Sequence, residues 1–211
     1  MDSLFNGPYF DYVMSQEPLC GAEYFEHGSS AMLFHREGKL YRLTTDGCGH
    51  NFLSQQSAVG NRLVVRVIQD FGPMAPNDDR VRDEFYWLSE VEWLEPVLPE
   101  SAEGAFLEKL FKGLTGDDLV DHHERERFLD RCTIAASTHK EYSGLLSTLI
   151  AAAQYLPVND GTVDANITNI MRRPSTDEIV WSDPMHFALG CLTEAQIAKM
   201  DRIREQVNPQ K

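Results

Sequence analysis

Hydrophobic and polar residues follow different patterns in the two halves of the chain. Between about residues 23 and 95, short runs of β-branched and aromatic residues alternate with turn-forming residues, which is typical of β-strands joined by tight turns. Between about residues 101 and 156, apolar residues recur three to four positions apart, which is the period of an amphipathic helix. The pattern therefore predicts an α+β protein with a small antiparallel sheet followed by helices.

The first half is expected to form that sheet. The predicted strands are 24–25, 32–35, 40–44, 63–68 and 85–88, with a helix at 49–59 and a hinge at 90–95. The run 63–68 is rich in β-branched residues, so we expect a central strand that ends at Phe71-Gly72-Pro73. Residues 1–22 show no sustained period and are predicted to be an irregular arm with a single helical turn.

The second half is expected to be mainly helical. Helices are predicted at 101–113, over most of 126–156 and at 193–206. Residues 142–155 are apolar nearly all round, which predicts a buried helix. Beyond it, 170–172 and 179–181 have strand composition and flank a turn-rich segment, so they predict a β-hairpin.

Polar residues around this hairpin are the strongest candidates for catalytic or metal-binding roles. Asp164 and Asn169 are five residues apart, and Asn169 leads directly into the first hairpin strand. Asp183 follows the second strand and precedes Pro184. Phosphoryl transfer uses this layout, in which one Asp takes the proton of the attacking hydroxyl while an Asn and a later Asp hold magnesium. Asp and Asn also favour turns for local reasons, which is the alternative explanation.

The motif Asp-x-x-x-x-Asn-Ile-Met at 164–171, followed by Asp183-Pro184 and Phe187, resembles the early serine/threonine protein kinases of T-seven-like podophages. The wider kinase-like superfamily, which includes aminoglycoside phosphotransferases, shares this layout more loosely. The resemblance is specific over about 163–187 and weak over the segment 24–95. Elsewhere the chain shows no such resemblance.

The resemblance implies a compact bilobal protein-kinase-like fold with a truncated helical C-lobe. Its parts would be an N-terminal arm (1–22), an N-lobe and hinge (23–95) and a short C-lobe (96–211). It implies ATP and Mg²⁺ as ligands, Asp164 as the catalytic base, and Asn169 and Asp183 as metal ligands. By spacing, Arg42 would contact the nucleotide phosphates, which Gly28-Ser29-Ser30 would cover.

Three features depart from the kinase pattern. Arg42 stands where kinases carry a lysine, and its longer planar head does not reproduce lysine geometry. The segment 49–59 contains no glutamate to pair with it, and Asp46 is the nearest acid. Few residues remain after Asp183 for a large C-lobe. These departures leave two alternatives open: a catalytically inactive kinase-like protein that inhibits a host enzyme, and a small-molecule phosphotransferase.

Composition bounds the partners. The 211 residues are 42% hydrophobic, which is enough for one core or two small lobes. The net charge of −14 disfavours direct nucleic-acid binding and suits basic protein partners, although it also serves solubility. No apolar stretch is long enough to span a bilayer and no signal pattern opens the chain, so a cytoplasmic location is expected. The resemblance implies the host cytoplasm, and host transcription or defence proteins as partners.

The four cysteines are widely spaced and form no Cys-x-x-Cys unit, so they indicate neither a zinc site nor a disulfide framework. We expect them to be reduced core thiols.

Overall fold

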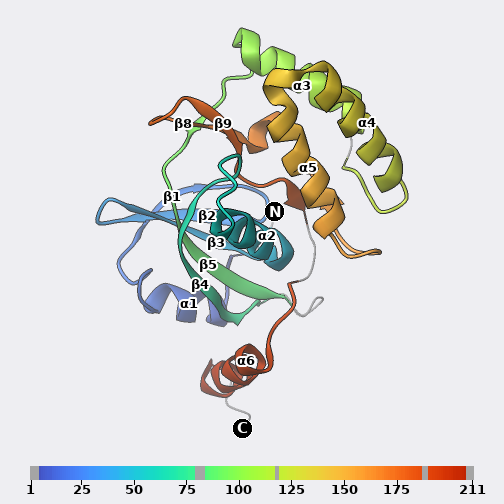
Figure 1. Cartoon of the computed structure of the whole chain (residues 1–211). Helices are drawn as coiled ribbons and strands as arrows, with labels where there is room; N and C mark the ends of the chain where they lie inside the picture. Colours follow the sequence, from blue (N-terminus) through green and yellow to red (C-terminus); the bar gives the residue numbers. More distant parts are fainter. Residues whose placement is uncertain (1–4, 79–83, 117–118, 187–189, 208–211) are drawn as a thin grey trace. The chain divides into compact units, whose positions relative to one another are not determined.

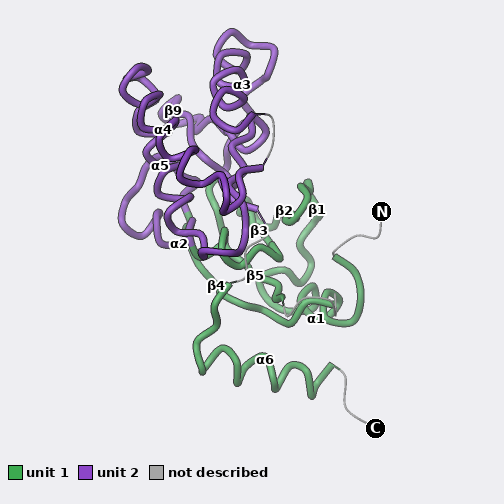
Figure 2. The backbone as a smooth tube through the Cα atoms, turned by 90° about the vertical axis from the view of Figure 1, so that its right-hand side faces the viewer, with its two compact units in different colours: residues 1–51, 67–92, 189–211 green, residues 52–66, 93–188 purple. Residues whose placement is uncertain are grey.

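The computed structural model describes residues 5–78, 84–116, 119–186 and 190–207, and the chain is mixed α+β (Figure 1). It divides into two compact units, coloured separately in Figure 2. Unit 1 comprises 1–51, 67–92 and 189–211, and unit 2 comprises 52–66 and 93–188. The boundary predicted between the N-lobe and the C-lobe, at residue 95, lies close to the observed boundary at residue 92. Residues 52–66 were predicted in the N-lobe and belong to unit 2, whereas residues 189–211 were predicted in the C-lobe and belong to unit 1.

Unit 1 is built on an antiparallel sheet whose strand order is β1-β2-β3-β5-β4. Its elements are α1 (Pro8–Ser15), β1 (Glu23–His27), β2 (Ala31–Arg36), β3 (Lys39–Thr44), β4 (Val67–Pro76), β5 (Phe85–Val91) and α6 (Glu194–Val207), while α2 (Gly47–Ala58) runs from unit 1 into unit 2. The first three predicted strands and the helix after them are confirmed. Glu37 and Gly38 both have positive φ angles, 54° and 78°, as the tight turn between β2 and β3 requires.

The prediction for 63–68 was wrong. Strand β4 begins only at Val67, continues through Phe71-Gly72-Pro73, and lies at an edge of the sheet. An edge strand tolerates proline because one side of its backbone needs no partner. Its pairing with β5 shifts register three times, and Gly72 has a φ of 70°. Val64 and Val65 instead contact Trp181 in unit 2, where Val65 N donates to Trp181 O at 2.8 Å.

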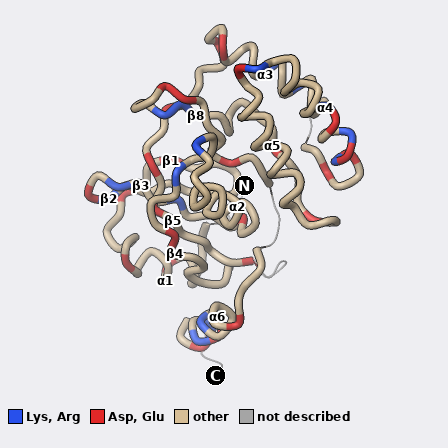
Figure 3. Tube along the Cα trace, viewed as in Figure 1, with Lys and Arg blue, Asp and Glu red and all other residues tan. Residues whose placement is uncertain are grey.

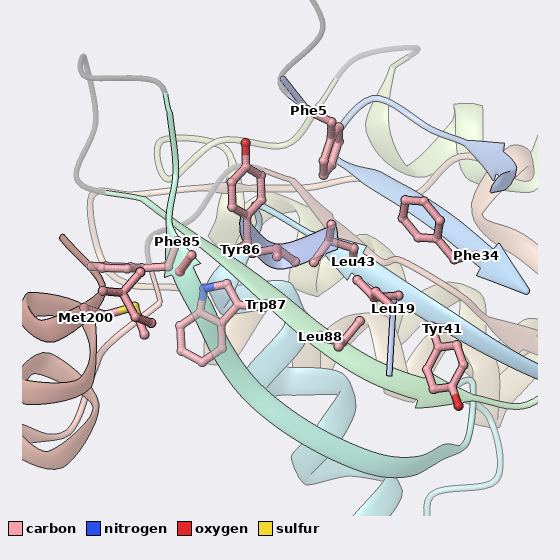
Figure 4. Close-up of a cluster of buried hydrophobic side chains, with 13 residues drawn as sticks. Phe5, Leu19, Phe34, Tyr41, Leu43, Phe85, Tyr86, Trp87, Leu88 and Met200 are labelled. Atoms are coloured by element: carbon pink, nitrogen blue, oxygen red, sulfur yellow. The ribbon is translucent and has the colours of Figure 1, made fainter. Parts of the chain in front are cut away.

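The core of unit 1 lies between the sheet and the two terminal helices. Tyr41 and Leu43 of β3 and Tyr86 and Leu88 of β5 belong to it. Val13 of α1 and Met200 and Ile203 of α6 are buried against the same cluster, and Figure 4 shows Met200 beside Phe85. Trp87 is 2% exposed and packs as part of this core.

Two of the four cysteines are buried as expected. These are Cys48 and Cys132, whereas Cys20 and Cys191 are exposed.

The N-terminal arm contains a regular two-turn helix, α1, where the sequence indicated an irregular segment with a single helical turn. Pro8 begins the helix, a position that suits its fixed φ. The carboxylate of Asp78 accepts hydrogen bonds from Tyr9 N at 3.0 Å and Phe10 N at 2.8 Å. Because this cap comes from a residue far along the chain, the local pattern gave no sign of it.

The last helix, α6, was predicted correctly but belongs to unit 1 rather than to the helical half. Thr193 and Gln196 cap it reciprocally: Gln196 N donates to Thr193 Oγ1 at 3.3 Å, and Thr193 N donates to Gln196 Oε1 at 2.8 Å. Lys199 Nζ donates to Pro73 O of β4 at 2.6 Å. The helix is therefore tied to the edge strand of the sheet.

Unit 2 contains the predicted helices and hairpin. Its elements are β6 (Glu95–Pro96), α3 (Ala102–Thr115), α4 (Arg125–Thr138), a 3₁₀ turn η1 (Lys140–Tyr142), α5 (Ser143–Tyr155), β7 (Thr162–Val163), η2 (Ile167–Asn169), β8 (Ile170–Arg173), β9 (Glu178–Trp181) and β10 (Met185–His186). Trp181 at the end of the hairpin is fully buried, and its Nε1 donates to Leu145 O of α5 at 3.0 Å. The helices thereby hold the hairpin and the polar loop that precedes it.

Along the described part of the chain, no helix is both long and apolar enough to cross a bilayer.

Candidate active site

A two-residue pairing brings Asp164 and Asp183 together. Strand β7 pairs antiparallel with β10, with Val163 opposite Met185. Asp164 directly follows β7, and Asp183 lies just before β10. Asp164 N donates to Pro184 O at 3.0 Å, which fixes the two loops against each other. The hairpin β8–β9 thus returns the chain to its starting point, so that both carboxylates lie at one place in unit 2.

Asn169 is held next to both acids. It ends the short turn η2, which Asn166 begins by accepting a hydrogen bond from Thr168 N at 3.1 Å. Asn169 Nδ2 donates to Asp164 O at 3.3 Å. Asn169 O accepts from both the N–H and the hydroxyl of Ser182, at 2.9 and 3.1 Å. Because Nδ2 is the donating atom, Oδ1 is the atom of this side chain that could bind a cation.

The environment of Asp164 raises the pKa of its carboxyl. Burial raises the pKa of this carboxyl above its ordinary value, and the nearby Asp183 charge acts in the same direction. A hydrogen bond from the Asn169 side chain and the proximity of His186 oppose the shift without reversing it. A carboxylate with increased proton affinity suits a general base, which must accept a proton from the group it activates.

The donor set fits a hard cation. Mg²⁺ binds oxygen ligands and is usually held by one or two carboxylates together with substrate phosphates. Asp183 supplies a carboxylate and Asn169 an amide oxygen. In the described ranges no group of three or more His, Cys, Asp or Glu side chains is arranged to hold a metal. A cation held by Asp183 and Asn169 would share its coordination with a bound phosphate and with water, as Mg²⁺ usually does.

The other predicted site residues lie in unit 1. Arg42 occupies the middle of β3, opposite Leu33 and Ser89, and is 6% exposed. Gly28 and Ser29 are exposed in the β1–β2 turn, which Gly28 N closes by donating to Ala31 O at 2.8 Å. Ser30 is buried, and its carbonyl accepts hydrogen bonds from Thr44 Oγ1 and Thr45 N at 2.8 and 3.0 Å. The structure thus groups Asp164, Asn169 and Asp183 in one unit and places the predicted phosphate contacts in the other.

The helix after β3, α2, has no glutamate, but two aspartates interact with residues of its first turn. Asp46 Oδ1 accepts a hydrogen bond from Gly49 N at 2.8 Å in the first turn of α2. His50, 1% exposed, lies 2.9 Å from Asp70 Oδ1 through its Nε2 and packs against the Trp87 ring. No sequence motif indicated this pair of a buried histidine and an exposed aspartate, because its two members come from different elements.

Arg172 and Arg173 are the cationic residues of β8, the strand that follows Asn169, and both have structural partners. Arg172 forms ion pairs with Glu103 of α3 and with Asp177 of the hairpin turn. Arg173 pairs with Glu178 at 2.8 Å and donates to the carbonyl of Arg62 at 2.9 Å. Both side chains therefore fix the β8–β9 hairpin. Phe187, the last residue of the sequence motif, lies outside the described residues.

A cavity of about 280 Å³ adjoins the candidate base. Its lining comes from the loop 164–167, from Leu119 and from one side of α3, which contributes Glu108, Phe111, Lys112 and Thr115. Sequence reasoning did not find these α3 residues. The sequence signal for them was their spacing: Glu108, Lys112 and Thr115 recur at helical intervals beside the apolar residues of the same helix, so they share one face of it.

The sequence of the chain matches no protein-family model, and comparison with curated proteins gives no match either.

Proposed function

We propose that the protein is a phosphotransferase of the phage-type serine/threonine kinase class, which transfers the γ-phosphate of ATP to host proteins or to itself. The observation that carries the proposal is the grouping of Asp164, Asn169 and Asp183 by the β7–β10 pairing and the β8–β9 hairpin. The three side chains have the types and chain order of a kinase base and its two metal ligands. The proposed location is the host cytoplasm.

In this proposal the acceptor is a serine or threonine hydroxyl. Its oxygen attacks the γ-phosphorus while the bond from that phosphorus to the bridging oxygen breaks, and ADP leaves. Asp164 takes the hydroxyl proton, which its raised pKa favours. Asn169 and Asp183 would hold Mg²⁺, whose charge offsets that of the phosphates when it is bound.

The five-stranded antiparallel sheet of unit 1 supports a kinase-like N-lobe in the proposal. A turn between the first two strands, a cation on the third and a helix after it follow the order of phosphate-binding parts in protein kinases. Arg42 is accordingly the proposed phosphate contact, and Gly28-Ser29-Ser30 the proposed covering turn. Arginine can bind phosphate in a bidentate manner, although its geometry differs from that of lysine.

A second candidate is a kinase-like protein without catalysis that binds a basic site on a host enzyme. It is favoured by α2, which has no glutamate to pair with Arg42. Acidic residues outnumber basic ones by 33 to 19, and Figure 3 shows where both kinds lie along the chain. Nucleotide binding distinguishes the two candidates.

Calorimetry of ATP binding with magnesium tests the proposal through Asp183. We expect the intact chain to bind Mg·ATP and Asp183→Asn to weaken that binding at least tenfold, because one charge of the cation site is lost. Asp177→Asn makes the same change on the exposed hairpin turn and should bind like the intact chain. Failure of the intact chain to bind Mg·ATP would favour the inhibitor, as would equal binding by both variants.

A further inference from the structure

Strand β1 is an exposed edge of the sheet in unit 1. It stands at one end of the strand order, and all of its residues, Glu23–His27, are exposed. Within the described ranges it pairs on one side only, with β2. The strand at the other end, β4, packs against α6, whose Lys199 donates to Pro73 O. An edge strand such as β1 offers backbone N–H and C=O groups with which a further strand can pair.

A β-bulge places two glutamates of β1 on the same face of the sheet. The register of β1 with β2 shifts around Phe25, which is the extra residue of the bulge and re-aims the side chains next to it. Glu23 pairs with His35, and Glu26 pairs with Leu33. These two partners are two residues apart in β2, so their side chains lie on one face. Both glutamates therefore project on that face, although they are three residues apart.

The opposite face of β1 continues the apolar core. Tyr24 pairs with Phe34, a core residue, and the two ring centroids are 6.4 Å apart in an edge-to-face arrangement. Tyr24 itself is 53% exposed, so the apolar surface of the core extends to the open edge of the sheet. Its hydroxyl forms a hydrogen bond with Nδ1 of His27. A strand added beside β1 would cover this ring.

The acidic face of β1 has no cation of its own. Neither Glu23 nor Glu26 forms an ion pair with another described residue. The segment 17–37 contains four glutamates and one arginine, Arg36, which pairs with Glu17 and Glu37. Basic side chains on an added strand would therefore place opposite charges beside each other across the two strands, which stabilises a sheet.

We propose that β1 is a docking site for a basic, extended segment of a partner protein, which adds to the sheet as a further strand. Main-chain hydrogen bonds hold the segment, and its side chains determine which sequence is accepted. Basic residues lie beside Glu23 and Glu26, and an apolar residue between them covers Tyr24. The accepted sequence thus alternates basic and apolar residues. The inference does not rest on the proposed function and is compatible with either candidate.

A second copy of the chain fits this edge poorly. When two β1 strands pair antiparallel in one continuous sheet, their acidic faces lie on the same side. Glutamates of one copy then lie beside glutamates of the other, and like charges in neighbouring positions are destabilising. The net charge of −14 on each chain also opposes self-association.

The test measures binding of short synthetic peptides to the full chain by calorimetry at low salt. The probe alternates lysine and valine. One control has glutamate in place of lysine, and a second has N-methyl groups on alternate residues, which removes the hydrogen bonds of strand pairing. The lysine peptide should bind at least about tenfold more tightly than either control. Its binding should slow the amide hydrogen exchange of residues 23–27.

Two matched double variants locate the charge pairing. Glu23→Lys with Glu26→Lys should bind the glutamate peptide more tightly than the lysine peptide, because the charge on the acidic face is reversed. Glu141→Lys with Glu205→Lys makes the same change in net charge at exposed positions of η1 and α6 and should keep the preference of the intact chain. A reversed preference includes a gain of binding, so loss of folding does not imitate it.

Several outcomes would overturn the proposal. One is no binding of the lysine peptide by the intact chain, and another is equal binding of its N-methylated form. Identical preferences in the two double variants would show that net charge, rather than β1, selects the peptide. Protection of residues 23–27 that rises with protein concentration in the absence of peptide would assign the edge to a second copy of the chain.

Discussion

An Asp164→Asn variant should lose phosphate transfer by about 10²- to 10⁴-fold, which is the usual contribution of a general base. Asparagine keeps the shape of the side chain but cannot take the proton of the acceptor hydroxyl. In the intact chain the rate should fall as the pH drops through a pKa above that of an ordinary aspartate, because burial raises it. Transfer is measured from labelled ATP across a pH series.

The control for this variant is Asp130→Asn, which makes the same change at an exposed position of α4 in the same unit. It should transfer phosphate at the rate of the intact chain. If both variants remained equally active, Asp164 would not be the base.

Asp164→Asn should also make the protein more stable at neutral pH, and this effect does not depend on the reaction. Because the folded pKa of Asp164 lies above its unfolded value, its ionised form costs the folded state free energy at neutral pH. The cost disappears as the pH falls below the unfolded pKa. Thermal unfolding should therefore show a gain in Tm at neutral pH that vanishes in acid.

The second large effect is expected from Gly104→Ala in the first turn of α3. A Cβ at this position would lie 2.1 Å from Leu98 O and 2.9 Å from Leu98 C. Both atoms belong to the backbone, so they cannot rotate away as a side chain does. The helix start, where Gly104 N donates to Ser101 Oγ at 3.0 Å, must shift instead. We expect a loss of about 3 kcal/mol in the free energy of unfolding.

Gly113→Ala is the matched control in the same helix. A Cβ there meets nothing within 4 Å, and alanine is favoured over glycine inside a helix by about 1 kcal/mol. The control should therefore stabilise the protein in denaturant unfolding, while Gly104→Ala destabilises it. Changes of the same sign in both variants would contradict the close contact between α3 and the segment before it.

Local patterns were sufficient for much of the fold. The turn at Glu37-Gly38, the hairpin around 173–178 and the buried helix α5 each depend on residues that are close in sequence. The pattern failed where distant residues decide the structure. Asp78 caps α1 from far along the chain. Strand β4 follows its pairing with β5 rather than the β-branched run before it.

The contrast between local and distant residues also explains which parts of the candidate site could be predicted. Asp164, Asn169 and Asp183 could be predicted because they flank a single hairpin, so sequence spacing fixes their proximity. The cavity could not be predicted, since it needs α3 to pack beside the loop 164–167. The same holds for His186, which reaches Asp164 only through the β7–β10 pairing and opposes the rise of its pKa.

The most direct test of the central claim is transfer of the γ-phosphate of labelled ATP by the purified intact chain, with magnesium and with host lysate. A phosphotransferase built on Asp164, Asn169 and Asp183 should place label on protein, and removal of magnesium should abolish the label. If no label appears while the chain is folded, and calorimetry detects no binding of Mg·ATP, the grouping of these residues does not serve phosphate transfer.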